Sequence, residues 1–209
     1  MSKVAIQGNA SGTGTFTIAA PNSNTDRTLT LPDEAGTVLT SAGTDNFPAK
    51  TILQVQTVLK TDTWSDSATA RLYSGDVTGL TVTITPKFAT SKLLVMASVD
   101  FSNSVSPYRC AAGIFRDGSL SGLVGDAASN RTRVTRGRTV DTNQNSALFH
   151  MGFVGAEDAG STASTTFSIR ILNVEASDGT VYVNRSSSDV DANYLTRSAS
   201  ALTVMEIAQ

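Results

Sequence analysis

The densest group of chemically capable side chains in this sequence is a run of arginines. Four lie within eight residues: Arg131, Arg133, Arg136 and Arg138. Guanidinium groups bind carboxylates and phosphates through paired hydrogen bonds, which suits arginine better than lysine to such ligands. One interpretation of the run is an anion-binding loop, for example for acidic sugars of a cell surface. The favoured interpretation is a solvated loop, or pairing with acids of a neighbouring subunit. Acids that could serve are Asp126, Asp141, Asp189 and Asp191.

Aromatic residues are scarce, at 6% of the chain. Tyr108 and Tyr194 fall in expected loops or strand ends, where a ring could stack on a sugar, although such residues also serve as packing at a rim. Arg109 follows Tyr108 directly, and we include both among the candidate receptor-contact residues. Because rigid sheets commonly present variable binding loops, we expect receptor contacts in residues 102–109, 126–143 and 185–198.

Catalytic signatures are weak. His150 is the only imidazole, and it lies in the strand-like segment Ala147–Val154. A strand histidine that faces solvent or a neighbour is the favoured interpretation over a catalytic triad. The segment Gly118–Gly122 has Leu120 where a nucleophile elbow requires serine. Paired carboxylates of a glycosidase need no fixed spacing, so that activity stays open as a minor alternative. We expect no enzymatic function.

Metal and cofactor motifs are also incomplete. Cys110 is the single cysteine, which excludes an intrachain disulfide and a cysteine-rich zinc site. Asp189–Asn193 begins like a calcium loop, but Tyr194 and Ser200 stand where that loop requires glycine and glutamate. An ordinary polar loop is the favoured interpretation. We expect no cofactor and no bound metal.

Composition narrows the class of protein further. The 209 residues carry a net charge of −2 and only 16% charged side chains, so a generally basic nucleic-acid-binding protein is not expected. A membrane-spanning helix needs about 20 apolar residues, and the apolar runs are far shorter. The N-terminus has no signal-peptide pattern. These features predict a soluble protein that is made in a cytosol.

The elements that position these residues read as strands, because apolar and polar residues alternate with a period of two. Expected strands span 52–60, 63–73, 81–85, 92–101, 108–115, 147–154, 166–174, 181–184 and 202–207. Turn residues separate them, and Asp117-Gly118 is a hairpin signal. The pattern predicts an all-β antiparallel sandwich or jelly roll. The final strand is expected at the centre of a sheet.

The first 48 residues differ from the rest. Short β-like pieces at 14–19, 27–31 and 36–40 each offer few large apolar side chains. Those side chains are Phe16, Ile18, Leu29, Leu31 and Val38. Such small β units are marginal alone, so another chain or a larger assembly should stabilise this segment. The prediction is an attachment or intertwining segment at 1–48, including a linker, and a second domain at 49–209.

Several stretches, in order, resemble appendage proteins of tailed bacteriophages. At the N-terminus these are Gly14–Pro21, Arg27–Pro32 and Ala35–Leu39. Further on they include Lys92–Met96, Arg116–Gly118, Gly125–Ala128, Asn184–Ser186 and Ser198–Ala208. The resemblance covers most of the chain, although each motif is short. The motifs of this family include no catalytic residues that could be assigned to this chain.

The resemblance implies a homotrimeric virion protein with a C-terminal jelly-roll knob. Residues 1–48 would attach to other virion proteins of the tail, baseplate or capsid. The knob of a short tail fibre would bind a host surface glycan multivalently. A capsid decoration or head-fibre protein is the main alternative, and a glycan depolymerase is a lesser one. No partner nucleic acid and no membrane insertion are expected.

Overall fold

The computed structural model describes residues 8, 10–15, 17–19, 22–26, 28, 30, 47–138 and 145–209. The chain divides into an N-terminal unit, Met1–Val38, and a C-terminal unit, Leu39–Gln209. The predicted boundary at residue 48 stays a prediction. Within the described ranges, no helix has the length and hydropathy to cross a membrane.

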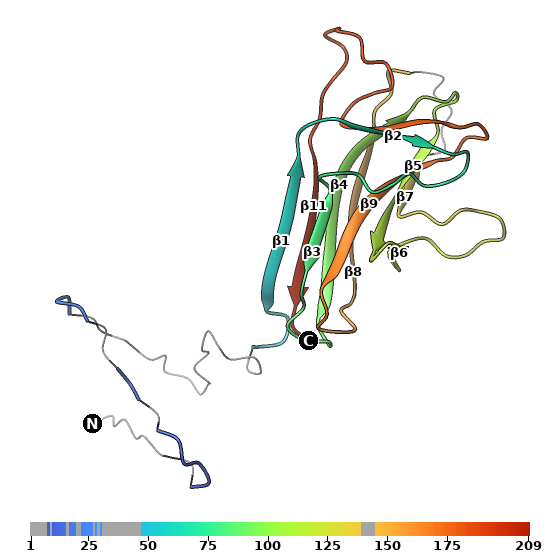
Figure 1. The fold of residues 1–209 in the computed structure, drawn as a ribbon. Helices are drawn as coiled ribbons and strands as arrows, with labels where there is room; N and C mark the ends of the chain where they lie inside the picture. The colour runs from blue at the N-terminus through green and yellow to red at the C-terminus, as the bar shows by residue number, and fades with distance from the viewer. Residues whose placement is uncertain are drawn as a thin grey trace. The chain divides into compact units, whose positions relative to one another are not determined.

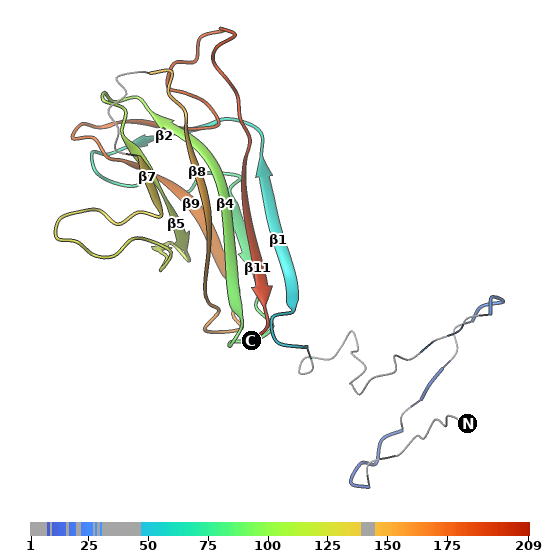
Figure 2. The ribbon, with the colours of Figure 1, turned by 180° about the vertical axis from the view of Figure 1, so that it is seen from behind.

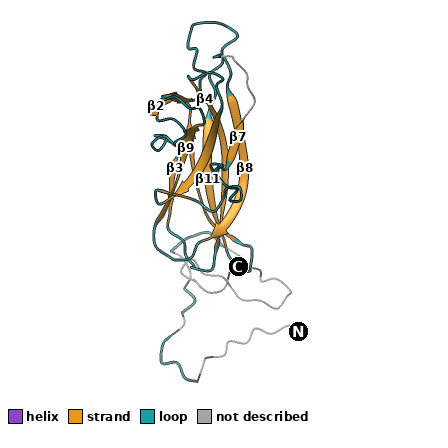
Figure 3. Ribbon diagram, turned by 90° about the vertical axis from the view of Figure 1, so that its right-hand side faces the viewer, coloured by secondary structure: helices purple, strands orange, loops and turns teal. Residues whose placement is uncertain are grey.

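The C-terminal unit is an all-β sandwich, as the alternation predicts (Figure 1). Its strands are β1 (Ile52–Lys60), β2 (Trp64–Ala68), β3 (Thr81–Ile84), β4 (Lys92–Asn103), β5 (Cys110–Arg116), β6 (Ser119–Leu120), β7 (Arg136–Arg138), β8 (Phe149–Asp158), β9 (Thr165–Asn173), β10 (Gly179–Val183) and β11 (Ser200–Ile207). The edge-on view in Figure 3 shows the two layers.

Two antiparallel sheets form the sandwich. Sheet A has the order β1-β11-β4-β10-β2, with β8 on the other side of β4. Sheet B has the order β3-β9-β5-β6, with β7 also paired to β5. The pairing is nested along the chain: β1 pairs with β11, β3 with β9, β4 with β8, and β5 with β6. As predicted, the final strand lies inside a sheet, between β1 and β4.

The core fills the space between the sheets. Alternate residues of β4, from Leu93 to Phe101, point inward and are buried. The rings of Phe101 and Phe149 lie 6.4 Å apart across the β4–β8 pair. Phe167 from sheet B is fully buried in the same cluster. Burial of these side chains is the main source of stability, at about 25 cal/mol per Å² of apolar area.

Most predicted strands are confirmed within a few residues. The Asp117-Gly118 hairpin is also present, with both residues at positive φ between β5 and β6. Two expectations are wrong: the strand expected at 63–73 ends at Ala68, and residues 136–138 form strand β7 rather than part of a loop. The strand pairs Arg136 with Ala112 and Arg138 with Cys110. Pairing to β5 overrides the polar composition of this segment, since only its backbone is needed for the ladder.

The N-terminal strands are not seen among the residues that can be compared. No described residue of 14–19 or 27–31 is in a strand, and segment 36–40 lies outside the described residues. Ile18 is 77% exposed. A strand requires a paired neighbour for its backbone groups, and the described residues of this unit do not supply one. The roles predicted for Phe16, Leu29, Leu31 and Val38 fall outside the described residues.

The chain entry and the long loops lie at opposite ends of the sandwich. At one end, the chain enters at residues 47–51 beside the C-terminus, where the Lys50 amide donates to the Ala208 carbonyl at 2.8 Å. At the opposite end lie the loops 104–109 and 184–199 (Figure 1). Two of the three expected receptor-binding loops therefore share the end that is remote from the chain entry.

Candidate functional site

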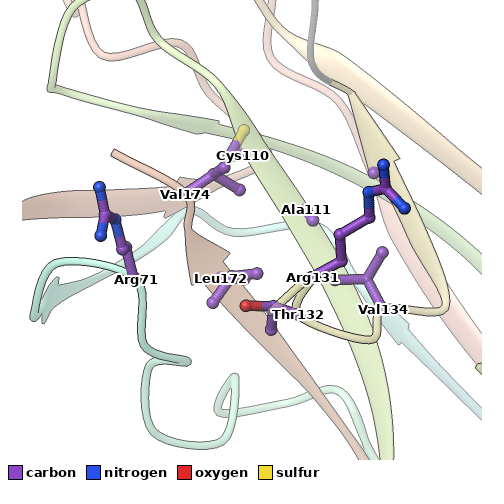
Figure 4. Close-up of a pocket in the computed structure, with 9 residues that line it drawn as sticks. Arg71, Cys110, Ala111, Arg131, Thr132, Val134, Leu172 and Val174 are labelled. Carbon is purple, nitrogen blue, oxygen red and sulfur yellow. The ribbon is translucent and has the colours of Figure 1, made fainter. Parts of the chain in front are cut away.

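A pocket of about 430 Å³ lies against the outer face of sheet B (Figure 4). Its floor is apolar and comes from Ala111 of β5, Leu172 of β9 and Val174. Arg71 and Arg131 stand on different sides of this floor. The full lining is Arg71, Cys110, Ala111, Arg131, Thr132, Val134, Gly137, Leu172 and Val174. Two cationic groups beside an apolar floor suit a ligand with a carboxylate and a hydrocarbon face.

The segment that carries Arg131 is held to the sheet by Tyr73. The Tyr73 hydroxyl donates to the Arg133 carbonyl at 2.9 Å. Its ring lies over the glycine at position 113 of β5, where a Cβ would come within 2.8 Å of the ring. Burial raises the pKa of Tyr73, so the phenol stays neutral and keeps its donor proton. Gly113 therefore provides the space that positions one wall of the pocket.

The four clustered arginines do not form one site. Arg131 lines the pocket on sheet B. Arg133 donates from Nε to the Gly125 carbonyl at 2.7 Å, a contact within its own loop. Arg136 lines a hollow on the outer face of sheet A instead. Arg138 is placed by its backbone pairing with Cys110. Arg131 and Arg133 lie in the loop before β7, whereas Arg136 is the first residue of that strand, so these side chains lie at different places on the surface.

Arg109 has a structural contact. Its Nε and Nη2 each lie 3.0 Å from a carboxylate oxygen of Glu175, and its backbone amide also donates to that carboxylate at 2.9 Å. The Glu175 side chain is buried. Such a bidentate pair holds loop 104–109 against the end of β9. The guanidinium predicted for receptor contact is thus engaged within the chain.

The two tyrosines lie at the remote end of the sandwich in different settings. Tyr108 is half-buried at φ 68° in the turn of loop 104–109. Tyr194 is 73% exposed in loop 184–199. In that loop, Asp189 pairs with both Arg185 and Arg197. The aspartate that begins the incomplete calcium motif therefore holds two guanidinium groups.

His150 lies opposite Asp100 in the β4–β8 pair. Its Nδ1 is 2.7 Å from the Asp100 carboxylate, and its side chain is 59% exposed. This agrees with the interpretation of a strand histidine that faces solvent and a neighbour. Among the described residues, no group of three or more His, Cys, Asp or Glu side chains is placed to hold a metal ion.

Arg71 is a cationic pocket residue that was not predicted from the sequence. Residues 63–73 were expected to form one strand, but β2 ends at Ala68. Arg71 then adopts φ 60° in the turn that follows. Ala70-Arg71 carries no turn-forming Gly, Pro, Asn or Asp, so no local signal marked this turn.

Comparison with known proteins gives only distant likeness. No family model matches the chain, and no curated protein matches it. Among solved structures, it is similar to a chain in a structure of infectious bursal disease virus, Gt strain, with 16% identity over 84% of this chain and a TM-score of 0.38. A chain of the T13 particle of the same virus gives 16% identity, 84% coverage and a TM-score of 0.32. This chain spans 43% and 40% of those viral chains. At such values the likeness carries no argument about function.

Proposed function

We propose that this chain is a virion appendage of a bacteriophage: a short tail fibre whose trimeric knob binds an acidic saccharide on the host surface without catalysing a reaction. The observation that carries the proposal is the pocket between Arg71 and Arg131 over an apolar floor. The resemblance of the ordered sequence motifs to phage appendage proteins supports the virion part. Residues 1–48 would attach the knob to the particle.

The strand pairing supports a jelly roll within the sandwich. When β2, β7 and β10 are set aside as additions to the pattern, the other eight strands pair first with last, second with seventh, third with sixth and fourth with fifth, the last pair through the two-residue strand β6. Nested pairing of this kind is what two interlocked Greek keys produce. A jelly roll presents loops at both ends, which fits one end for attachment and the other for contact.

The chemistry of the pocket favours a carboxylated sugar over a neutral one. Guanidinium groups form charge-assisted hydrogen bonds with a carboxylate, and these are about twice as strong as neutral ones. The floor of Ala111, Leu172 and Val174 would take the apolar face of the ring. A single open site of this kind binds weakly. Three sites on one knob, repeated around a particle, would raise the overall affinity through effective concentration.

We expect Arg131→Ala or Arg71→Ala to weaken binding of the full chain to a carboxylated polysaccharide such as alginate by about tenfold each. The reason is the loss of a charge-assisted hydrogen bond of about 1.5–3 kcal/mol. Lys87→Ala is the matched control, because Lys87 is an exposed cation in the loop beside the chain entry. Dextran, a neutral polysaccharide, should bind none of the proteins.

Equal alginate binding by the Arg131→Ala variant, the Arg71→Ala variant and the wild type would overturn the pocket assignment.

The location of this protein on the virion is tested separately, by gold-labelled antibodies on intact particles. Label at the tail is the expected result. Label spread over the capsid would favour the decoration or head-fibre alternative instead.

A further inference from the structure

We propose that the outer face of sheet A is the surface through which copies of this chain associate. The inference rests on the homo-oligomer of the proposed function but not on its ligand. Figure 2 shows β8, β4, β11 and β1 side by side on this face. We call this surface the neutral face. It consists of the outward residues of these four strands that lie between the charged row at Lys92 and Asp158 and the charged row at Asp100 and His150.

The neutral face has no charged side chain at the outward positions of three successive rows. The rows are Val55-Met205-Leu94-Ala156, Thr57-Thr203-Met96-Val154 and Leu59-Ala201-Ser98-Gly152. Antiparallel sheets that face water normally alternate between buried apolar and exposed polar residues. Here both sides of the sheet are mainly apolar, so the outward side is built for a contact rather than for water.

The two charged rows that bound this face are paired within the chain, and Arg136 lies beside its hollow. At one end, Lys92 bonds to Asp158 at 2.6 Å. At the other end, His150 lies 2.7 Å from Asp100. The only polar pair inside the rows is Thr57 with Thr203, whose hydroxyls bond to each other at 2.7 Å. Apart from Arg136 at the hollow, the face offers a charged partner no countercharge for the hydration it would lose, whereas the neutral rows of a second copy carry no charge.

Beside its pocket, the outer face of sheet B is covered by side chains of this chain. The Tyr73 ring lies over β5, and Arg170 lies 4.2 Å from the Phe115 ring centroid while it bonds to Asp76. At the exposed edge of the same face, the hydroxyls of Thr83 and Thr166 bond at 2.9 Å. The neutral face has no equivalent cover from the described segments (Figure 2). This contrast assigns the association surface to sheet A.

The size of the face suits the apolar centre of an interface. Four strands about 4.8 Å apart and about six residues long give an area on the order of 400 Å². Monomers rarely expose larger apolar patches without a function for them. A standard interface buries about 800 Å² per partner, so the two ionic rows and Arg136 would form its polar rim.

The two halves of the face differ in shape. On the β1 side, Leu59 is 69% exposed and Val55 is 46% exposed. On the β4–β8 side there is a hollow lined in part by Met96, Ser98 and Gly152. Unlike halves favour a contact in which the β1 side of one copy meets the β4–β8 side of the next. Such head-to-tail contacts close into rings, which a trimer requires.

Charge placed in either half should separate the copies. We expect Leu59→Lys and Val154→Lys, at two exposed positions, each to raise the dissociation constant of the assembly about 100-fold or more, because a charge without a countercharge would be buried. Thr81→Lys is the matched control, since Thr81 is exposed on edge strand β3 of sheet B. Native mass by light scattering and circular dichroism would be measured for all four proteins.

The proposal predicts an assembled wild type and control, and two folded variants with the mass of one chain. A second readout does not depend on the lysine variants folding. Val154→Cys should react with a maleimide at least tenfold more slowly than Thr81→Cys, and Cys110 is buried and gives little background. The proposal would be overturned by a monomeric wild type, by lysine variants that stay assembled, or by equal labelling rates. These results are independent of alginate binding, so either proposal can fail alone.

Discussion

Glu206→Gln should destabilise the sandwich by about 2–4 kcal/mol at neutral pH, although it changes one atom of a side chain in a strand interior. Glu206 is fully buried in β11. One carboxylate oxygen accepts from the Ser91 hydroxyl and the Lys87 amide, both at 2.8 Å, and from the Phe88 amide at 3.1 Å. The other accepts from Gln54 at 2.6 Å. A glutamine would turn an amide donor toward one of these donors.

The pH dependence of this effect has a definite sign. Burial by itself raises the pKa of Glu206, but the hydrogen bonds from Gln54, the Lys87 amide, Ser91 and the Phe88 amide outweigh it and lower the pKa below its usual 4.5. The ionised form is therefore favoured in the folded state. The ionised side chain therefore contributes to the free energy of unfolding at a pH above its pKa in the unfolded chain. This contribution is lost as the pH falls through the lower pKa of the folded state.

Denaturant titrations at fixed protein concentration measure both effects. The difference in free energy of unfolding between the wild type and the Glu206→Gln variant should be large at neutral pH and should shrink below pH 4.5. Asp158→Asn is the control, since its carboxylate is 72% exposed and should change stability by less than about 1 kcal/mol. A Glu206→Gln variant as stable as the wild type at neutral pH would show that these hydrogen bonds are not needed.

Asn184→Ala should lower the free energy of unfolding by about 3–5 kcal/mol and should loosen the loop 184–199. Asn184 is fully buried. Its amide donates to the carbonyls of Lys60 and Asp62 at 2.9 and 2.8 Å, and its side-chain oxygen accepts from Ser200 at 2.6 Å. These bonds join the end of β1, the end of β10 and the start of β11. Removing the side chain leaves buried polar groups without partners.

The backbone at Asn184 gives this prediction a distinctive control. Its φ is 63°, a left-handed conformation that asparagine and glycine tolerate and alanine does not. Asn184→Gly should therefore be more stable than Asn184→Ala by about 1 kcal/mol, the reverse of the usual order in a strand. Asn193→Ala, at an exposed position of the same loop, should be nearly neutral. Thermal unfolding of the three variants would check the order; an Asn184→Ala variant within 1 kcal/mol of the wild type would refute it.

Strand positions were predictable from the sequence because burial on one side of a sheet leaves a period-two pattern. In the segment from Lys92 to Phe101, one set of alternate residues is apolar throughout, and these residues form the core side of β4. The other set consists of Lys92, Leu94, Met96, Ser98 and Asp100, so only its middle carries large apolar residues. Only the strand order shows that Leu94 and Met96 belong to a neutral face that continues across β1, β11 and β8.

The candidate site was less predictable because it depends on contacts between distant segments. The run of arginines is visible in the sequence, but Arg131 lies in a loop over sheet B and Arg136 lies in β7 beside a hollow on sheet A, so the two line different surfaces. Arg109 could not be distinguished from a receptor contact without its partner Glu175, which lies 66 residues away. Arg71 joins Arg131 only because β2 ends early and the chain turns over sheet B.

We propose that this chain works as a trimeric knob with a shared neutral face and three outward pockets. The native mass of the full-length wild type, by size exclusion with light scattering at micromolar concentration, tests it most directly. A mass of three times 21.8 kDa is the predicted result. A mass of 21.8 kDa would contradict both the trimer and the assignment of the neutral face to a second copy.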